Sequence, residues 1–256
     1  MISLTDLILG QAYALLLVLA RVGVTFAVLP GLGETSAPAM LKTGLALGMT
    51  LLLLPVVEPL LPPRPDTGPE LALLLAAEVL NGLWFGWLAR VLTTSLPVAG
   101  QFIADFAGLS NILQPSPDLG GQTTALSRLY EVAVPALILC SGLYTVPLSA
   151  LAGYYRLMPP GTPLWASDSA ALTIAAVSES FALALRLASP FVLAAIAWNT
   201  AVGLVARLVP KLQIYFVAMP GQIGLGLLLF AWIAAPLTGV WMEAMRTGLA
   251  ALPGGH

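Results

Sequence analysis

The sequence predicts an all-α integral membrane protein with about six apolar segments, and three observations support this fold class. Apolar residues make up 59% of the 256 residues and charged residues only 9%, whereas soluble domains carry about a quarter of charged residues. The mean hydropathy is +0.94, and the apolar residues form long runs that could cross about 30 Å of hydrocarbon as helices. These runs lack the alternation of period two that a β-barrel requires.

Turn-forming residues separate the apolar stretches. Lipid offers no partner to unpaired backbone groups, so each stretch is expected to be helical. Several stretches contain prolines, including Pro55, Pro135, Pro190 and Pro236, and an internal proline removes a helical hydrogen bond and usually bends the axis. We therefore expect bent helices rather than straight, independent spans. In chain order the stretches are residues 7–29, 40–61, 71–96, 129–155, 170–208 and 223–252.

Charge and composition exclude several classes of function. Ten Lys and Arg against twelve Asp and Glu give a net charge of −2, so no basic surface for nucleic acid is expected. A single cysteine, Cys140, and a single histidine, His256, cannot form a thiolate cluster or a pair of histidine ligands. The glycine motifs that bind nucleotides are also missing. We expect no metal, no cofactor and no enzymatic activity.

Ionisable residues inside the apolar stretches need protein partners. A charge in hydrocarbon costs at least about 2.5 to 3.5 kcal/mol on insertion scales. Arg21 and Glu78 lie deep in their stretches, whereas Arg90 and Glu131 lie near the ends and could extend to the interface. Two interpretations of the deep pair remain open. They could pair with charges of this chain or of neighbouring subunits, or they could line a substrate or proton path in a transporter.

Small residues spaced four apart indicate close helix packing. Such spacing occurs at Gly44 and Gly48, at Gly82 and Gly86, and along Gly100, Ala104 and Gly108. Contacts within the chain and contacts between subunits explain this pattern equally well. A further aromatic cluster, Trp84, Phe85 and Trp87, is typical of a belt at the membrane interface.

Residues 97–124 form the least regular part of the sequence, with two prolines and two glycines between positions 111 and 122. Irregular backbone at membrane depth survives only when protein buries it or when it lines a water-filled cavity. A long surface loop is the alternative interpretation.

Three blocks of residues combine prolines, small residues and single charges at fixed spacing, and together they span most of the chain. The first block is Arg21, Pro30, Pro38, residues 42–46 and Pro55; the second is Ala99, Gly100, residues 108–110 and Pro117; the third is Pro190, Asn199, Gly203, Leu204, Arg207, Pro210, Leu212, Ile214 and Pro220. With these blocks the sequence resembles the FliR-type family of the flagellar and type III secretion export apparatus.

The resemblance implies a function and an architecture. The chain would be a single export-gate membrane domain over residues 1–256, a core channel subunit that helps form and close the path for unfolded exported proteins. Its helices would form bent hairpins that assemble with partner subunits, rather than a simple six-span bundle. The implied partners are P-type and Q-type export-gate subunits, the B-type switch subunit and the A-type export component. The implied location is the flagellar basal body in the bacterial inner (cytoplasmic) membrane, and the central block favours the flagellar system over an injectisome.

The resemblance also implies two sets of functional residues. A pore plug is expected at about residues 106–122, with Phe106, Gly108, Leu109, Ser110, Asn111, Ile112, Leu113 and Pro117. Assembly and packing are expected to involve Arg21, Pro30, Pro38, Lys42, Gly100, Asn199, Gly203, Arg207, Pro210 and Pro220. A multispan solute transporter or small channel remains the alternative. That class often contains inverted repeats with matching breaks in the two halves, and the stretch 97–124 has no counterpart in the second half.

Overall fold

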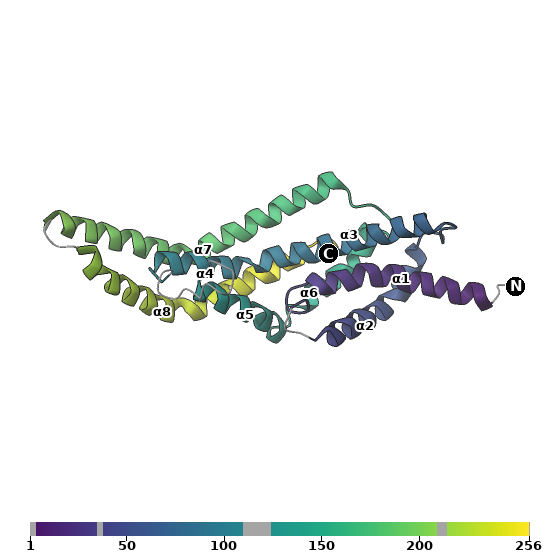
Figure 1. The fold of residues 1–256 in the computed structure, drawn as a ribbon, viewed down its shortest axis with the longest axis horizontal. Helices are drawn as coiled ribbons and strands as arrows, with labels where there is room; N and C mark the ends of the chain where they lie inside the picture. The colour runs from purple at the N-terminus through teal and green to yellow at the C-terminus, as the bar shows by residue number, and fades with distance from the viewer. Residues whose placement is uncertain (1–3, 35–37, 110–123, 209–213, 256) are drawn as a thin grey trace. The chain divides into compact units, whose positions relative to one another are not determined.

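The computed structural model describes residues 4–34, 38–109, 124–208 and 214–255. Within these ranges the chain forms helices and no strands. Figure 1 traces the helices in chain order: α1 Leu4–Val28, α2 Ala39–Val57, the short 3₁₀ helix η1 Glu58–Leu60, α3 Gly68–Thr93, α4 Ser95–Phe106, α5 Ala125–Cys140, α6 Thr145–Leu157, α7 Ala166–Leu208 and α8 Ile214–Ala250.

Every predicted apolar stretch corresponds to helical structure. Among the described residues, five helices are long and apolar enough to cross a membrane. A sixth span results when α5 and α6, which meet at a bend of 74°, are counted together. The predicted class of all-α integral membrane protein is therefore confirmed.

Prolines lie inside several of these helices without ending them. Pro55 lies within α2, Pro135 within α5 and Pro190 within α7, and α8 contains both Pro220 and Pro236. Each proline lacks the N–H group that would otherwise donate to the preceding turn. Apolar surroundings tolerate such sites because neighbouring groups satisfy the freed carbonyl. The helices therefore continue through the prolines at which the sequence predicted bends.

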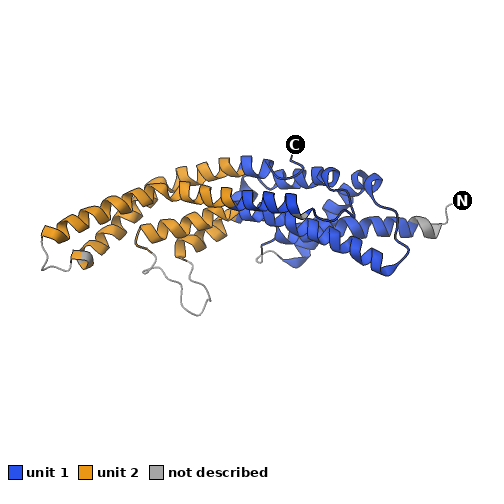
Figure 2. Ribbon diagram, turned by 90° about the horizontal axis from the view of Figure 1, so that it is seen from above, with its two compact units in different colours: residues 1–92, 135–177, 246–256 blue, residues 93–134, 178–245 orange. Residues whose placement is uncertain are grey.

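The described chain consists of two compact units (Figure 2). Unit 1 comprises residues 1–92, 135–177 and 246–256, and unit 2 comprises residues 93–134 and 178–245. The helices α3, α5, α7 and α8 contribute residues to both units. Each unit is therefore built from segments that are distant in the sequence.

In unit 1, α1 and α3 approach closely because α3 carries glycines at the contact. A Cβ atom added at Gly82 would collide with the Arg21 carbonyl oxygen, and one added at Gly86 would lie 3.1 Å from the Thr25 carbonyl oxygen. The Thr25 hydroxyl lies 3.1 Å from the Gly82 carbonyl oxygen and 2.8 Å from that of Arg21. The spacing of Gly82 and Gly86 thus serves packing within the chain.

The other pair of glycines four residues apart has no such contact. A Cβ atom added at Gly44 or Gly48 of α2 would meet nothing within 4 Å. The same helix exposes Met40 and Leu52, at 84% and 74% of their surface. This face of α2 is open to lipid or to another polypeptide.

In unit 2, the core contains α4, α5 and α8. Trp241 of α8 is completely buried, and its indole N–H donates to the Ser95 hydroxyl oxygen at 3.0 Å. A Cβ atom at Gly100 of α4 would lie only 2.7 Å from the ring of Tyr130 on α5. The Tyr130 ring in turn contacts Phe230 edge to face, with centroids 6.4 Å apart. A glycine thus brings α4 against α5 here, as glycines bring α1 against α3 in unit 1.

We predict that Gly82→Ala destabilises the protein whereas Gly48→Ala does not. The added methyl group at position 82 has no room against α1, and such overpacking costs about 1 to 3 kcal/mol. At position 48 the space is open, and alanine favours the helix by roughly 0.5 to 1 kcal/mol over glycine. Thermal unfolding of the two purified variants in detergent measures the difference. Equal unfolding temperatures would contradict the proposed α1 and α3 contact.

Candidate functional site

Unit 1 contains a fully buried ion pair. Arg21 Nε donates to Glu78 Oε2 at 2.8 Å, and Arg21 Nη2 donates to Glu78 Oε1 at 3.0 Å. Both side chains have an exposed fraction of 0%. Two parallel hydrogen bonds between guanidinium and carboxylate are the strongest geometry for such a pair. The partner of Arg21 is therefore a charge of the same chain, 57 residues away.

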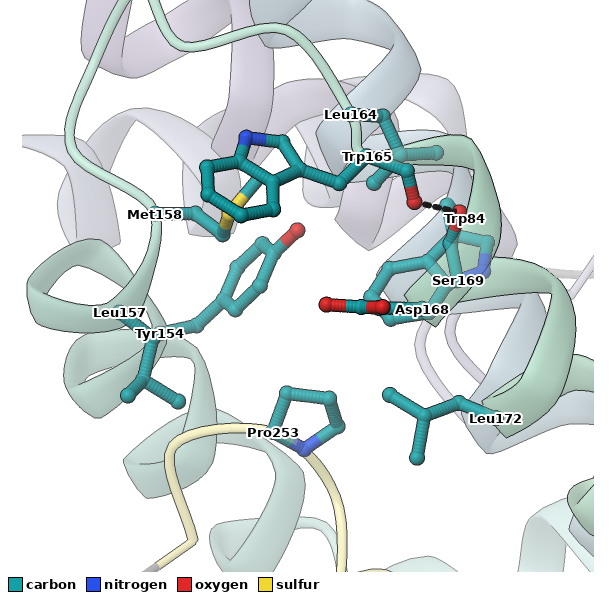
Figure 3. Close-up of a pocket in the computed structure, with 10 residues that line it drawn as sticks. All are labelled: Trp84, Tyr154, Leu157, Met158, Leu164, Trp165, Asp168, Ser169, Leu172 and Pro253. Carbon is teal, nitrogen blue, oxygen red and sulfur yellow. Dashed lines mark hydrogen bonds between the residues drawn. The ribbon is translucent and has the colours of Figure 1, made fainter.

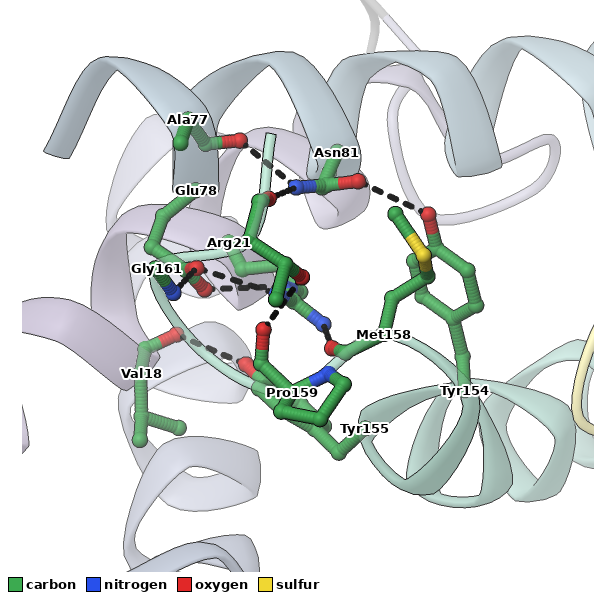
Figure 4. Close-up of polar contacts among 12 residues, drawn as sticks. Val18, Arg21, Ala77, Glu78, Asn81, Tyr154, Tyr155, Met158, Pro159 and Gly161 are labelled. Atoms are coloured by element: carbon green, nitrogen blue, oxygen red, sulfur yellow. Dashed lines mark hydrogen bonds and ion pairs between the residues drawn. The ribbon is translucent and has the colours of Figure 1, made fainter. Parts of the chain in front are cut away.

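The same pair holds the backbone that follows α6 (Figure 4). Arg21 Nη1 donates to the Met158 carbonyl oxygen at 2.8 Å, and the Gly161 N–H donates to Glu78 Oε1 at 2.7 Å. Gly161 has a φ of +84°, a conformation that favours glycine because it has no Cβ atom. The Arg21 guanidinium also lies over the Tyr155 ring, 4.3 Å from its centroid. The pair thus connects α1, α3 and the segment after α6.

An asparagine extends this network. Asn81 Nδ2 donates to the carbonyl oxygens of Ala77 and Thr162, at 2.9 Å each. Its Oδ1 accepts a hydrogen bond of 2.9 Å from the Tyr154 hydroxyl. Asn81 is itself buried, so its amide is satisfied entirely by the protein, as buried polar groups require. Within the described residues, the polar side chains of Arg21, Glu78 and Asn81 are thus bonded to groups of the same chain.

The aromatic cluster on α3 is divided between the interior and the surface. Phe85 is completely buried and stacks on Tyr154, with centroids 5.3 Å apart. Trp87 is 38% exposed, and Trp84 is half-buried. The interpretation of all three as an interfacial belt is therefore wrong for Phe85, because its ring fills the core beside α6.

The charges near the segment ends remain partly exposed. Arg90 Nη1 donates to the Val28 carbonyl oxygen at 3.1 Å, and its Nη2 lies 3.7 Å from Glu34 Oε2. Glu131 accepts a hydrogen bond of 2.8 Å from Arg128, three residues earlier in α5. Because Arg90 and Glu131 remain partly exposed, their charges lose less hydration than those of the buried pair Arg21 and Glu78.

In unit 2, α8 holds the start of the predicted plug. Gln222 Nε2 donates to the Phe106 carbonyl oxygen at 3.2 Å. A Cβ atom at Gly226 would lie 2.6 Å from Ala107 Cβ, so this glycine lets α8 contact the end of α4. Gly108 has a φ of +72°, and Leu109 is only 4% exposed. The chain therefore turns sharply after α4 while it is still packed against α8.

The chain returns to the same helix after the predicted plug. The Thr124 N–H donates to Gln101 Oε1 at 3.1 Å, and Gln101 Nε2 lies 3.3 Å from both carboxylate oxygens of Asp105. The residues on either side of positions 110–123 are thus attached to α4 or packed against its end.

The sequence analysis did not predict three residues that contact the chain on either side of the plug: Gln101, Gln222 and Gly226. Gln222 and Gly226 belong to the run from Gly221 to Gly226 in α8, where three glycines and a glutamine interrupt an otherwise apolar sequence. This interruption is the signal that could have identified them. Gln101 directly follows the predicted Gly100, but its contact with Thr124 depends on the fold.

The predicted assembly residues do not form one cluster. Arg21 and Pro30 are buried in unit 1, Lys42 is half-buried on α2, and Pro38 is exposed. Gly100 is buried in unit 2, whereas Asn199, Gly203, Arg207 and Pro220 are exposed there. The predicted residues Ser110, Asn111, Ile112, Leu113, Pro117 and Pro210 lie outside the described residues. Asn199 uses its side-chain amide within α7, donating to the Ala195 carbonyl oxygen at 2.8 Å.

Metal chemistry finds no support in the described ranges. They contain no group of three or more His, Cys, Asp or Glu side chains that could hold a metal ion. The polar groups at the two sites instead make structural contacts between helices and loops. Within the described residues, the fold and sites define a helical integral membrane protein with a buried ion pair, in which the chain on either side of positions 110–123 is bound by α8 and by α4.

Comparison with known proteins places this chain in a family. The family described as "Bacterial export proteins, family 1" matches residues 12–248, which is most of the sequence. The chain therefore belongs to this family, whose members include the FliR-type proteins, and it is a membrane component of a type III export apparatus.

Individual relatives cover nearly the whole chain. The flagellar biosynthetic protein FliR of Caulobacter vibrioides is 34% identical over 236 residues, which are 92% of this chain and 94% of the relative. FliR of Bacillus subtilis is 26% identical over 84% of each chain. The Yop proteins translocation protein T of Yersinia pestis is 25% identical over 85% of this chain and 84% of the relative. The similarity therefore extends to both flagellar and translocation proteins.

We predict that Arg21→Ala strongly destabilises the protein. The variant leaves the Glu78 carboxylate buried without its partner, which typically costs about 3 to 5 kcal/mol. Replacing both residues with apolar ones, as Arg21→Met with Glu78→Leu, should restore part of this loss because no unpaired charge remains. Thermal unfolding of the purified variants measures both effects.

The exposed pair Arg128 and Glu131 provides the control for this prediction. The Arg128 side chain is 71% exposed, so Arg128→Ala should change stability by no more than about 0.5 kcal/mol. Comparable losses for Arg21→Ala and Arg128→Ala would show that the buried pair has no special role.

Proposed function

We propose that this chain is a core channel subunit of a flagellar type III export gate, in the bacterial inner membrane, that helps form and close the path for unfolded exported proteins. The observation that supports this proposal most directly is the attachment of the central segment at both ends. Phe106 and Ala107 contact α8 on one side, and Thr124 is bound by Gln101 on the other. Membership of the export family supplies the class of cargo.

The closing role is assigned to residues 106–122 as a plug. A plug must be held near its site while its central part is free to be displaced by cargo. Fixed ends and an irregular sequence with prolines and glycines suit both requirements. A large pocket of polar side chains is not needed for this role, because exclusion of water and ions requires only tight filling of the path.

The proposed partners follow from the family and from the open apolar surfaces. The FliR-type resemblance supports P-type and Q-type subunits as direct neighbours, with the B-type switch subunit and the A-type export component in the same apparatus. Exposed apolar side chains such as Trp232 and Leu208, each 80% exposed, must be covered by lipid or by other subunits. The open glycines of α2 would let a neighbouring helix approach as closely as α1 approaches α3.

The alternative of a solute transporter has no comparable support. A transporter would use deep charges such as Arg21 and Glu78 to bind a substrate or a proton. Both side chains are fully buried and paired with each other, so neither charge is accessible to a solute.

We predict that disturbing the attachment of the plug makes the membrane leak ions. Deleting residues 108–117 should increase ion conductance in cells that carry the whole apparatus, because the path then lacks its closing segment. Gly226→Ala should produce a smaller increase, since the new methyl group would displace Ala107. The measurement is ion influx through the inner membrane of cells that express each variant.

The matched control for the leak is Gly224→Ala, in the same helix. A Cβ atom at Gly224 meets nothing within 4 Å, so this variant should conduct like the parent. Unchanged conductance in the deletion variant would refute the plug.

We predict that Gly48→Leu reduces the recovery of partner subunits while the chain itself remains stable. A Cβ atom at this position meets nothing within 4 Å in the chain, whereas a leucine side chain there prevents another helix from approaching closely. Gly48→Ala provides the control, because alanine still allows close approach. Affinity purification of the tagged chain, with quantification of the membrane proteins that accompany it, measures the effect. Equal recovery of partners with Leu and Ala would exclude α2 from the assembly contact.

A further inference from the structure

Unit 1 contains a cavity next to the buried network, with a volume of about 240 Å³. Its walls come from α3, the end of α6, the start of α7 and the C-terminal tail (Figure 3). The lining is mainly aromatic and aliphatic: Trp84, Tyr154, Leu157, Met158, Leu164, Trp165, Asp168, Ser169, Leu172 and Pro253. Neither the plug nor the predicted assembly residues include any of these side chains.

The Tyr154, Trp84 and Ser169 donors of the cavity wall are engaged within unit 1. The Tyr154 hydroxyl donates to Asn81 Oδ1 at 2.9 Å. Trp84 Nε1 donates to Thr173 Oγ1 at 3.1 Å, and the Ser169 hydroxyl donates to a main-chain carbonyl oxygen at 2.6 Å. A ligand in the cavity therefore finds few donors. This arrangement disfavours a phosphate or a carboxylate as the group that binds beside Asp168.

The charge that faces the cavity is negative. Asp168 lies in the first turn of α7, and its carboxylate points into the cavity between the rings (Figure 3). One of its oxygens accepts a hydrogen bond of 3.1 Å from the Ser167 hydroxyl, and a carboxylate has acceptor capacity beyond that bond. Arg21 lies 5.3 Å from the Tyr154 ring, but Glu78 neutralises it.

Three aromatic rings line the cavity together with this carboxylate, whose residue is exposed. Trp84 and Tyr154 lie 6.1 Å apart between centroids, inclined at 39°, and Trp165 closes the opposite side (Figure 3). Faces of tryptophan and tyrosine attract cations within about 6 Å through their quadrupoles. Aromatic rings around a carboxylate form the kind of site that binds a substituted ammonium group.

We propose that this cavity binds the ammonium headgroup of a membrane lipid, with phosphatidylethanolamine as the representative ligand. The ammonium group donates to the Asp168 carboxylate and lies against the rings of Trp165 and Trp84. The acyl chains leave along the apolar rim of the cavity. The site is independent of the plug, and it assigns this part of unit 1 a role in lipid recognition.

A lipid is favoured over a soluble amine by the rim of the cavity. Leu157, Trp165 and Leu172 are 62%, 64% and 45% exposed. Such surfaces on a membrane protein are covered by apolar material. Tryptophan is also enriched at the level of lipid headgroups, where one part of its ring system meets polar groups and the rest meets hydrocarbon. A ligand that carries both an ammonium group and hydrocarbon satisfies the rim and the carboxylate together.

Native mass spectrometry of the full chain in detergent tests this site. The chain is mixed with equal amounts of phosphatidylethanolamine and phosphatidylglycerol that carry the same acyl chains. We expect the parent protein to retain phosphatidylethanolamine over phosphatidylglycerol by about tenfold, the combined effect of a cation–π contact and an ion pair at an exposed site. Asp168→Asn and Trp165→Leu should each remove most of this preference.

Asp66→Asn is the matched control, because it removes the same charge from an exposed residue outside the cavity and should leave the preference intact. Thermal unfolding confirms that each variant is folded, and Trp165→Leu keeps the test valid if Asp168→Asn is unstable. Equal retention of the two lipids by the parent protein would overturn the proposal, as would an unchanged preference in both cavity variants.

Two further experiments, competition by free ethanolamine and cross-linking, identify the molecule that carries the ammonium group. Free ethanolamine that competes at the same concentration as the lipid would overturn the lipid assignment in favour of a soluble amine. Cross-linking of the assembled apparatus that places a lysine of a partner subunit against Trp165 would overturn it in favour of a protein contact. Weak competition by ethanolamine and lipid cross-links at Trp165 would support the proposal.

Discussion

The buried pair of Arg21 and Glu78 is the constraint on which the rest of unit 1 depends. Removing both charges from water is expensive, and only good geometry and further hydrogen bonds offset that cost. The structure meets this requirement by bringing the Met158 carbonyl and the Gly161 N–H to the pair. Satisfying two charges therefore determines the path of the chain after α6, and with it the position of the cavity beside Tyr154.

Close approach of helix backbones is the second organising feature, and glycine makes it possible in both units. Apolar helices in lipid gain little from burying hydrophobic surface against one another, so packing and interhelical hydrogen bonds drive their association. Gly82 admits the backbone of α1 in unit 1, and Gly226 admits the end of α4 in unit 2. The second contact lies where α4 ends, next to the start of the proposed plug.

The two units suggest a division of roles. In unit 1 the ion pair of Arg21 and Glu78 is fully buried and hydrogen-bonded to the chain after α6, which suits a rigid part of the proposed assembly. In unit 2 the chain on either side of positions 110–123 is attached to α4 by the hydrogen bond between Thr124 and Gln101 and to α8 by the hydrogen bond between Gln222 and Phe106, together with the packing of Ala107 against Gly226. Such hydrogen bonds contribute only about 0.5 to 1.5 kcal/mol each, a strength compatible with the displaceable plug that we propose.

The sequence by itself determined the fold class, the six apolar stretches and the need of Arg21 and Glu78 for partners, because length, hydropathy and the cost of a buried charge are properties of local sequence. Only the tertiary structure decided that these two residues pair with each other, that Gly82 packs inside the chain while Gly48 remains open, and that Gln101 and Gln222 hold the ends of the central segment. Those outcomes depend on which helices lie side by side. Apolar stretches of similar length and hydropathy carry too little information to choose their neighbours.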